Sequence, residues 1–482
     1  MRGFHSSVSR REFMKVLGLG TAGLGAIAAS APVFNDLDEI VSSGGKWKRP
    51  WWVKEVDNPT MEVDWSLING SAPNENSEGL HHWQVMAKYL GQDEALRLLA
   101  QGQEDKINGI LANRPGCTLR DCALNTGGGK HGEITWEGPQ TLTPEQMGVP
   151  RWEGTPEENS RMLRSAMRHY GAGEFGVVEV DQNIKKLLYL KDGSRLFITP
   201  QGVQGYDRPF HYEFKDIDEG YVDDANSAFV LPNKAKYLVT YTVEMPRELF
   251  RTSQSDLSNQ GSSSRYRRQQ EVINCTQGFL RSIGYRGYGT GPFPNGICPS
   301  PASATLSGLG EMDRKNQCTL PDLGVNVGLF KFFTDLPLVV TKPIDAGIFR
   351  FCHTCKKCAE TCPSQSIMYE DEPTWETPGN WATTGHKAFF KHEVSCQTLR
   401  NSSGVACQTC MGVCVFNVNT AASVHEFVKT TIATTSIFNG FLWQADKFFG
   451  YGLHDAEEWW DLDLPIYGID STRGAYDGGY AK

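Results

Sequence analysis

The sequence predicts an α+β protein with a small metal-cluster domain embedded late in the chain. Residues 82–110 and 158–170 repeat apolar side chains at helical spacing, whereas 175–180 and 237–245 have the composition and alternation of strands. Eight of the thirteen cysteines lie between Cys352 and Cys414, and this distinguishes that stretch from the rest of the chain.

Two further elements complete the expected order. Asp192-Gly193 is a typical hairpin turn, and it predicts that strands at 187–190 and 196–199 pair with each other. After the strand at 237–245, a helix is expected to begin near residues 261–264, where serine is a good N-cap, and to end near Ile283.

Bulk composition indicates a globular protein of two to four domains. The chain has 482 residues, of which 39% are hydrophobic, and its net charge is −9. The first 31 residues carry Arg2, Arg10, Arg11 and Lys15 against Glu12, so the remainder carries about −12. An acidic body repels phosphate backbones, which argues against a nucleic-acid partner.

The N-terminus has the features of an export signal. Arg10 and Arg11 precede a soft apolar run, residues 16–31, that is rich in Gly and Ala and too short for a membrane-spanning helix. Paired arginines before such a run are typical of a twin-arginine signal. Because that pathway carries folded proteins, it suits a protein that receives its cofactors in the cytoplasm. We therefore expect the twin-arginine translocase as a partner.

The cysteine-rich stretch contains two ligand runs. The first has the spacing of a bacterial ferredoxin, and the second repeats it with a longer first gap. In two-cluster ferredoxins the fourth cysteine of each run serves the other cluster. This predicts two 4Fe–4S clusters, one held by Cys352, Cys355, Cys358 and Cys414, the other by Cys362, Cys396, Cys407 and Cys410. Zinc sites also use C-x2-C pairs and are the alternative.

With these motifs the sequence resembles the respiratory reductive dehalogenases. The resemblance rests on the twin-arginine leader, the paired cysteine runs and two further segments. The third feature is 333–338 (Phe-Thr-Asp-Leu-Pro-Leu) with 342–347 (Lys-Pro-Ile-Asp-Ala-Gly), and the fourth is the aromatic tail from Phe448 to Asp470. The family implies a corrinoid of the cobalamin type in a nitroreductase-like core, fed by the two clusters. No Asp-x-His-x-x-Gly motif occurs, in agreement with the family's base-off corrinoid.

The resemblance also implies catalytic residues. Tyr266 heads a helix like the one that carries the family's proton-donating tyrosine, and Arg314 matches the family's active-site arginine. Asn295 resembles a third active-site residue, although a short insertion near 289–294 shifts its spacing. A phenol holds its proton at neutral pH, and a guanidinium would stabilise the phenolate that remains after transfer.

The implied organisation has five parts. They are a signal peptide (1–31), an N-terminal region (32–165), a corrinoid-binding catalytic core (166–345), a ferredoxin-like domain (346–420) and an aromatic-rich unit that closes the active site (421–482). The family further implies a halogenated organic substrate, a small integral-membrane anchor protein, an upstream respiratory electron donor, and attachment to the outer face of the cytoplasmic membrane. An exported, non-catalytic electron-transfer subunit and an epoxyqueuosine reductase-like enzyme are the alternatives.

Overall fold

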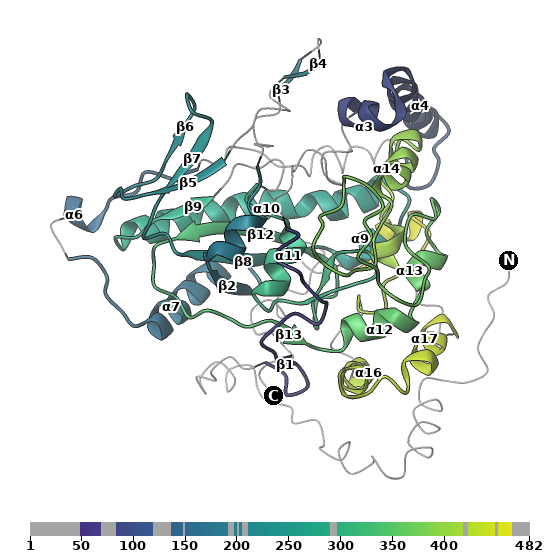
Figure 1. Ribbon diagram of the computed structural model, residues 1–482. Helices are drawn as coiled ribbons and strands as arrows, with labels where there is room; N and C mark the ends of the chain where they lie inside the picture. Colours follow the sequence, from purple (N-terminus) through teal and green to yellow (C-terminus); the bar gives the residue numbers. More distant parts are fainter. Residues whose placement is uncertain are drawn as a thin grey trace.

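A four-stranded antiparallel sheet forms the centre of the molecule (Figure 1). The computed structural model describes residues 49–68, 83–118, 136–147, 150–190, 197–199, 202–204, 211–289, 296–417, 423–448 and 452–464. The strands, in spatial order, are β2 (Phe175–Glu179), β8 (Tyr237–Glu244), β12 (Val327–Thr334) and β9 (Gly287–Gly289). β8 and β12 pair along their whole length, with Tyr237 opposite Thr334.

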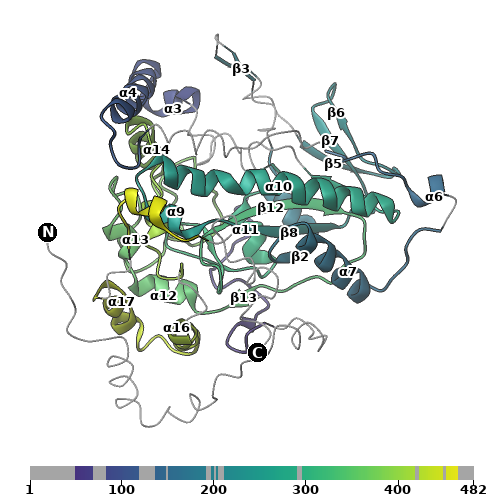
Figure 2. The same ribbon diagram turned by 180° about the vertical axis from the view of Figure 1, so that it is seen from behind.

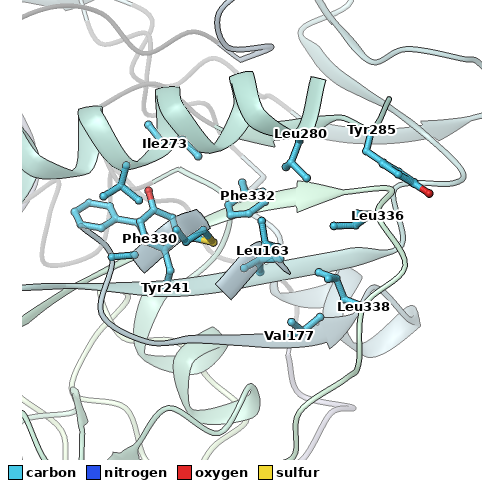
Figure 3. Close-up of a cluster of buried hydrophobic side chains, with 14 of the residues drawn as sticks. Leu163, Val177, Tyr241, Ile273, Leu280, Tyr285, Phe330, Phe332, Leu336 and Leu338 are labelled. Carbon is cyan, nitrogen blue, oxygen red and sulfur yellow. The ribbon is translucent and has the colours of Figure 1, made fainter. Parts of the chain in front are cut away.

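Helices cover both faces of this sheet. α7 (Pro156–His169) and the long α10 (Asp256–Ser282) pack on one face, and α11 (Ser300–Leu306) lies on the other (Figures 1 and 2). Apolar side chains of α7, α10 and the sheet interdigitate between them, among them Leu163, Leu280 and Phe332 (Figure 3). The N-caps Thr155 and Ser255 fix where the two helices begin.

A second, smaller sheet extends the core. It contains β5 (His211–Lys215), β7 (Ala228–Pro232) and β6 (Tyr221–Asp223), with β5 and β7 parallel. Phe229 and Leu231 of β7 share an apolar cluster with Leu238 and Phe333 of the central sheet. Three short antiparallel pairs are β1 (Lys54–Glu55) with β13 (Ile344–Asp345), β3 (Phe197–Thr199) with β4 (Gly202–Gln204), and β10 (Glu311–Met312) with β11 (Cys318–Thr319).

Short helices gather at one end of the molecule, on the right in Figure 1. They are α12 (Ile348–Thr354), α13 (Lys357–Glu360), α14 (Glu393–Ser402), α15 (Thr409–Gly412), α16 (Ser423–Thr434) and α17 (Asn439–Phe448). The other helices are α3 (Trp83–Leu90), α4 (Gln92–Leu111), α6 (Pro144–Met147), α8 (Gln182–Leu187), α9 (Arg247–Arg251) and the 3-10 helix η3 (Glu457–Asp461). Among the described residues no helix is long and apolar enough to cross a membrane.

The α+β prediction and most of its elements are confirmed. The helix expected at 82–110 is interrupted by Gly91, whose φ of +85° suits glycine, so that α3 and α4 are separate. The strand expected at 187–190 is wrong, because Asp181 caps a helix that ends at Leu187. The proposed turn at 192–193 lies outside the described residues. The helix expected from 261–264 begins earlier, at Asp256.

Candidate functional site

One group of cysteines surrounds α12 and α13. Cys352 lies in α12, Cys355 caps the C-terminal end of that helix, Cys358 lies in α13, and Cys414 comes from the turn after α15. The first three are buried. Cys358 interacts electrostatically with Cys352 and Cys414, and Cys355 interacts with both Cys358 and Cys414. The structure therefore brings together the four side chains expected to share one cluster.

A second group lies beside the first. Cys396 is in α14, Cys407 precedes α15, and Cys410 is in α15. Cys410 interacts electrostatically with Cys396 and Cys407, and it shares an apolar cluster with Cys362. Because Cys358 belongs to that same apolar cluster, the two cysteine groups are neighbours.

Burial makes free thiolates unfavourable at these positions. It raises the pKa of the thiols of Cys352, Cys355 and Cys358, and it raises that of Cys410 to about 12. Deprotonation therefore needs a bound metal to stabilise the charge.

The spacing of the ligands bears on which metal that is. Within the described ranges no three His, Cys, Asp or Glu side chains approach closely enough to hold a single ion. A zinc site places all four ligands around one ion, whereas a cubane binds each cysteine at a different iron. The first run has the ferredoxin spacing in the sequence, and this favours cubanes over zinc.

Two lysines lie beside the cysteine groups, one at each; Lys315 is buried and Lys391 is largely covered. Lys315 Nζ is 2.6 Å from Asp313 Oδ2 and 3.7 Å from Cys414 Sγ. At the second group, Lys391 Nζ is 3.0 Å from Glu393 Oε2. Burial favours the neutral amine, but the neighbouring carboxylates and cysteines outweigh it and raise the pKa of both lysines. Both side chains are thus held as cations next to sulfur.

Arg314, expected to be catalytic, lies beside the first cysteine group and is not the arginine that contacts Tyr266. It lies in the turn between β10 and β11, and its side chain is fully buried. Main-chain carbonyls accept hydrogen bonds from its guanidinium at 2.6–3.2 Å. They belong to Cys352, His353, Cys355, Met368 and Glu370. The guanidinium also stacks over the ring of Phe389. It therefore shapes the loops around the first cysteine group.

A different arginine contacts Tyr266. Arg265, the preceding residue on α10, donates a hydrogen bond from Nη2 to the phenol oxygen at 2.9 Å, and its guanidinium lies 4.7 Å from the centre of the Tyr266 ring. Ser262 Oγ and Met245 Sδ hold the other side of Arg265. A guanidinium only donates, so this bond uses the phenol as an acceptor and does not consume the phenol proton.

Tyr266 lies between the cysteine groups and the core. It is ten residues after the start of α10, or about 15 Å along the helix axis. Near that start, the main-chain N–H of Gln408, next to Cys407, donates to Ser253 Oγ at 2.8 Å. The Tyr266 ring packs edge-on against Phe330 of β12.

The sequence reasoning missed several functional candidates. Arg265 precedes Tyr266 in the chain, and Lys315 follows Arg314. Sequence spacing cannot tell such neighbours apart, because their roles depend on where each side chain points in the fold. Asn295 lies outside the described residues. Of the described cysteines outside the two runs, Cys275 is exposed, whereas Cys117, Cys298 and Cys318 are buried.

Comparison with known proteins gives a consistent picture. A family model described as "Reductive dehalogenase subunit" matches residues 48–143 and 126–338. A chloroethene reductive dehalogenase of Dehalococcoides mccartyi (strain VS) is 31% identical, and the match covers 98% of this chain and 99% of the relative. A trichloroethene reductive dehalogenase from another strain of that species is 30% identical, with 96% and 98% covered.

Solved structures show the same fold at lower identity. The catabolic reductive dehalogenase NpRdhA superposes with a TM-score of 0.56 at 18% identity, over 83% of this chain and 49% of that one. A structure reported with a mechanism for B12-dependent dehalogenation gives the same TM-score and identity. The mixed α+β fold of this chain is therefore that of known reductive dehalogenases.

Proposed function

This chain belongs to the reductive dehalogenase family and is an oxidoreductase of carbon–halogen bonds, and from that premise we propose that it replaces halide by hydrogen on a chlorinated ethene. The reaction consumes two electrons and one proton, breaks one carbon–halogen bond, forms one carbon–hydrogen bond and releases halide. The chloroethene and trichloroethene enzymes that match almost the whole chain support this substrate class. Family membership sets aside both alternatives, the electron-transfer subunit and the epoxyqueuosine reductase-like enzyme.

The observation that carries the proposal is the assembly of eight cysteines into two adjacent groups. We propose that Cys352, Cys355, Cys358 and Cys414 hold one 4Fe–4S cluster and that Cys362, Cys396, Cys407 and Cys410 hold the other. Two such clusters in a ferredoxin-like domain transfer one electron at a time. The helix α10 begins beside the second group and continues across the core, so the electron supply and Tyr266 share one rigid element.

The core has a feature that suits a corrinoid. One buried hydroxyl without a hydrogen-bond partner among the described residues is that of Thr276 on α10. Buried polar atoms normally have partners, so such a position fits a cofactor that carries amide groups. We propose that a base-off corrinoid binds in this nitroreductase-like core. When bound, it supplies the reduced cobalt centre at which the carbon–halogen bond is broken.

The protein's own part in the chemistry is to deliver the proton. Tyr266 donates it, and Arg265, whose Nη2 lies 2.9 Å from the phenol oxygen, stabilises the phenolate that is left. The aromatic ring of Phe330 fixes the plane of the phenol. Asn295 completes the proposed catalytic set.

We also propose where the enzyme works. The paired Arg10 and Arg11 direct twin-arginine export, and a small integral-membrane protein holds the mature chain at the outer face of the cytoplasmic membrane, where a respiratory donor reduces it. Replacing both arginines by lysine should leave a folded, unprocessed precursor in the cytoplasm. Unchanged export would refute the signal. Complete release of the native protein by salt, with no co-purifying membrane subunit, would refute the anchor.

The function is tested with purified holoprotein under anaerobic conditions. The enzyme, with a reduced low-potential dye as donor, is offered tetrachloroethene, trichloroethene, vinyl chloride, chlorobenzene and bromobenzene, and halide and product are measured. Chlorinated ethenes should yield one halide for every two electrons. If the enzyme turned over only the aromatic halides, the proposed substrate class of chlorinated ethenes would be wrong. Absence of halide release from protein with full iron and cobalt would overturn the proposed function.

A further inference from the structure

The turn between β10 and β11 inserts a positive charge among the sulfur atoms of the first cysteine group. Lys315 follows Arg314 at this turn, and its side chain is 2% exposed. Its Nζ lies 3.7 Å from Cys414 Sγ, within the range of an N–H···S hydrogen bond. Cys352 and Cys358 also interact electrostatically with this ammonium.

This ammonium has two partners. The nearer is the Asp313 carboxylate, 2.6 Å away, which also accepts hydrogen bonds from the main-chain N–H groups of Lys315 (2.7 Å) and Gln317 (3.2 Å) and from Thr319 Oγ1 (2.6 Å). Burying an ammonium costs several kcal/mol of desolvation unless its surroundings compensate. The carboxylate supplies part of that compensation, and the sulfur of Cys414, 3.7 Å away, is the second partner.

The second cysteine group has a different environment. Lys391 pairs there with Glu393, as Lys315 pairs with Asp313, and it interacts electrostatically with Cys396 and Cys410. The hydrogen bonds to the sulfur atoms of this group, however, come from neutral groups: the main-chain N–H of Ser366 lies 3.4 Å from Cys362 Sγ, and Thr409 Oγ1 lies 3.5 Å from Cys407 Sγ. Among the described residues, an ammonium N–H within bonding distance of a cysteine sulfur is thus a feature of the first group.

We infer that Lys315 sets the two proposed clusters at different midpoint potentials, by stabilising the reduced state of the cluster at Cys352, Cys355, Cys358 and Cys414. Adding an electron makes a cluster more negative, and a fixed cation with an N–H directed at a ligand sulfur favours that state. The electron then resides preferentially on the first cluster. Electron transfer between the two clusters therefore runs from the second to the first. This inference rests on the two clusters of the proposed function.

The test measures potentials and not activity. Holoprotein is titrated electrochemically while the signals of the two reduced clusters are followed by electron paramagnetic resonance. The signals are assigned with Cys358→Ala and Cys407→Ala, each of which should remove one cluster. Lys315→Met should then lower the midpoint of the first cluster so that its ratio of reduced to oxidised form falls about tenfold or more at a fixed potential, or about 59 mV for one electron. The second cluster should shift less, because among its ligands Lys315 interacts with Cys410 and forms its hydrogen bond to sulfur only in the first group.

Three further variants separate charge from structure. Lys315→Gln keeps a neutral N–H donor and should give a smaller shift in the same direction; it also serves if the methionine variant fails to fold. Lys315→Gln with Asp313→Asn removes both charges, keeps an N–H donor and so isolates the hydrogen bond. Lys391→Met, the matched control, should move only the second cluster.

The outcomes separate the inference from the function on which it rests. Wild-type protein without cluster iron would overturn both. Lys315 variants with full iron, both signals and an unshifted first midpoint would overturn the inference alone and leave the proposed function standing. Equal shifts of both clusters would likewise overturn it.

Discussion

The guanidinium of Arg314 donates to the carbonyl oxygen of Cys352 through two of its nitrogens, Nε at 2.9 Å and Nη2 at 2.6 Å. The same group also binds the carbonyl of Cys355. One side chain thus binds the main-chain carbonyls of the first two cysteines of the ferredoxin run. Arg314 thus holds the main chain around the first cysteine group, and in the proposed function Arg265 is the arginine that stabilises the phenolate.

Arg314→Lys should therefore weaken the protein and its first cluster before it affects chemistry. An ammonium cannot span five carbonyls, so several buried acceptors lose their donors, at a cost on the order of 3 kcal/mol. We expect a lower midpoint of denaturant unfolding and a preferential loss of the signal of the first cluster. Arg265→Lys, the matched control, should retain both. Normal stability and iron content with strongly reduced turnover in Arg314→Lys would restore the catalytic assignment.

The cysteine groups could be predicted because short gaps along the chain determine them. Thiolates two residues apart can bind one small cluster in almost any fold, so spacing carries the information. The direction of Arg314 could not be predicted, because its carbonyl partners lie 38–56 residues further along the chain. Whether a hairpin tip faces a cluster or a catalytic pocket depends on tertiary packing.

The fold shows the same distinction between local and distant information. The alternating segment at 237–245 became β8 because both of its neighbours, β2 and β12, bury it. In contrast, the apolar residues at 187–190 fitted either a strand or a helix end. The side chain of Asp181 accepts a hydrogen bond from the N–H of Ile184 at 2.8 Å and so caps the helix α8. That bond forms only once the chain turns there.

Acid should destabilise the turn that carries Lys315. His386 Nε2 lies 3.1 Å from Oδ1 of Asn316, the next residue in that turn, and burial lowers the pKa of His386 to about 4. The stabilisation from the neutral ring is complete above pH 6.5 and is lost as the pH falls from 6.5 to 4, because the unfolded state binds the proton first. The loss is on the order of 3 kcal/mol.

Unfolding by denaturant at pH 7, 5.5 and 4 measures this effect. His386→Asn keeps a side-chain donor near Asn316 but does not titrate, so its stability should fall less steeply over the same interval. Equal slopes for the variant and the wild-type protein would show that His386 is not the titrating group.

Removing single ligands should separate the two clusters. The holoprotein should contain about eight irons and one cobalt. Cys358→Ala should remove the cluster of the first group, and Cys407→Ala that of the second, because the two cysteines lie in different groups. Iron analysis and electron paramagnetic resonance give the readout. If both variants lost the same signal, the assignment of ligands between the two runs would be wrong.

The last prediction concerns the proton. Tyr266→Phe keeps the ring against Phe330 and deletes the only proton that the phenol can give. Iron and cobalt content should be unchanged while turnover falls roughly 10²-fold or more, the usual scale for general acid catalysis. Near-normal turnover in a fully loaded Tyr266→Phe enzyme would place the donor elsewhere.

A variant of Arg265 tests the same proton transfer, because we propose that Arg265 acts on the chemistry through Tyr266. Arg265→Gln removes the charge 2.9 Å from the phenol oxygen but retains a polar side chain beside Ser262, and it should also reduce turnover. Combined with Tyr266→Phe, it should add little, since both variants disable one proton transfer and such losses are less than additive. Fully additive losses in the double variant would mean that Arg265 contributes through packing or cofactor binding, and iron and cobalt content would then distinguish these two.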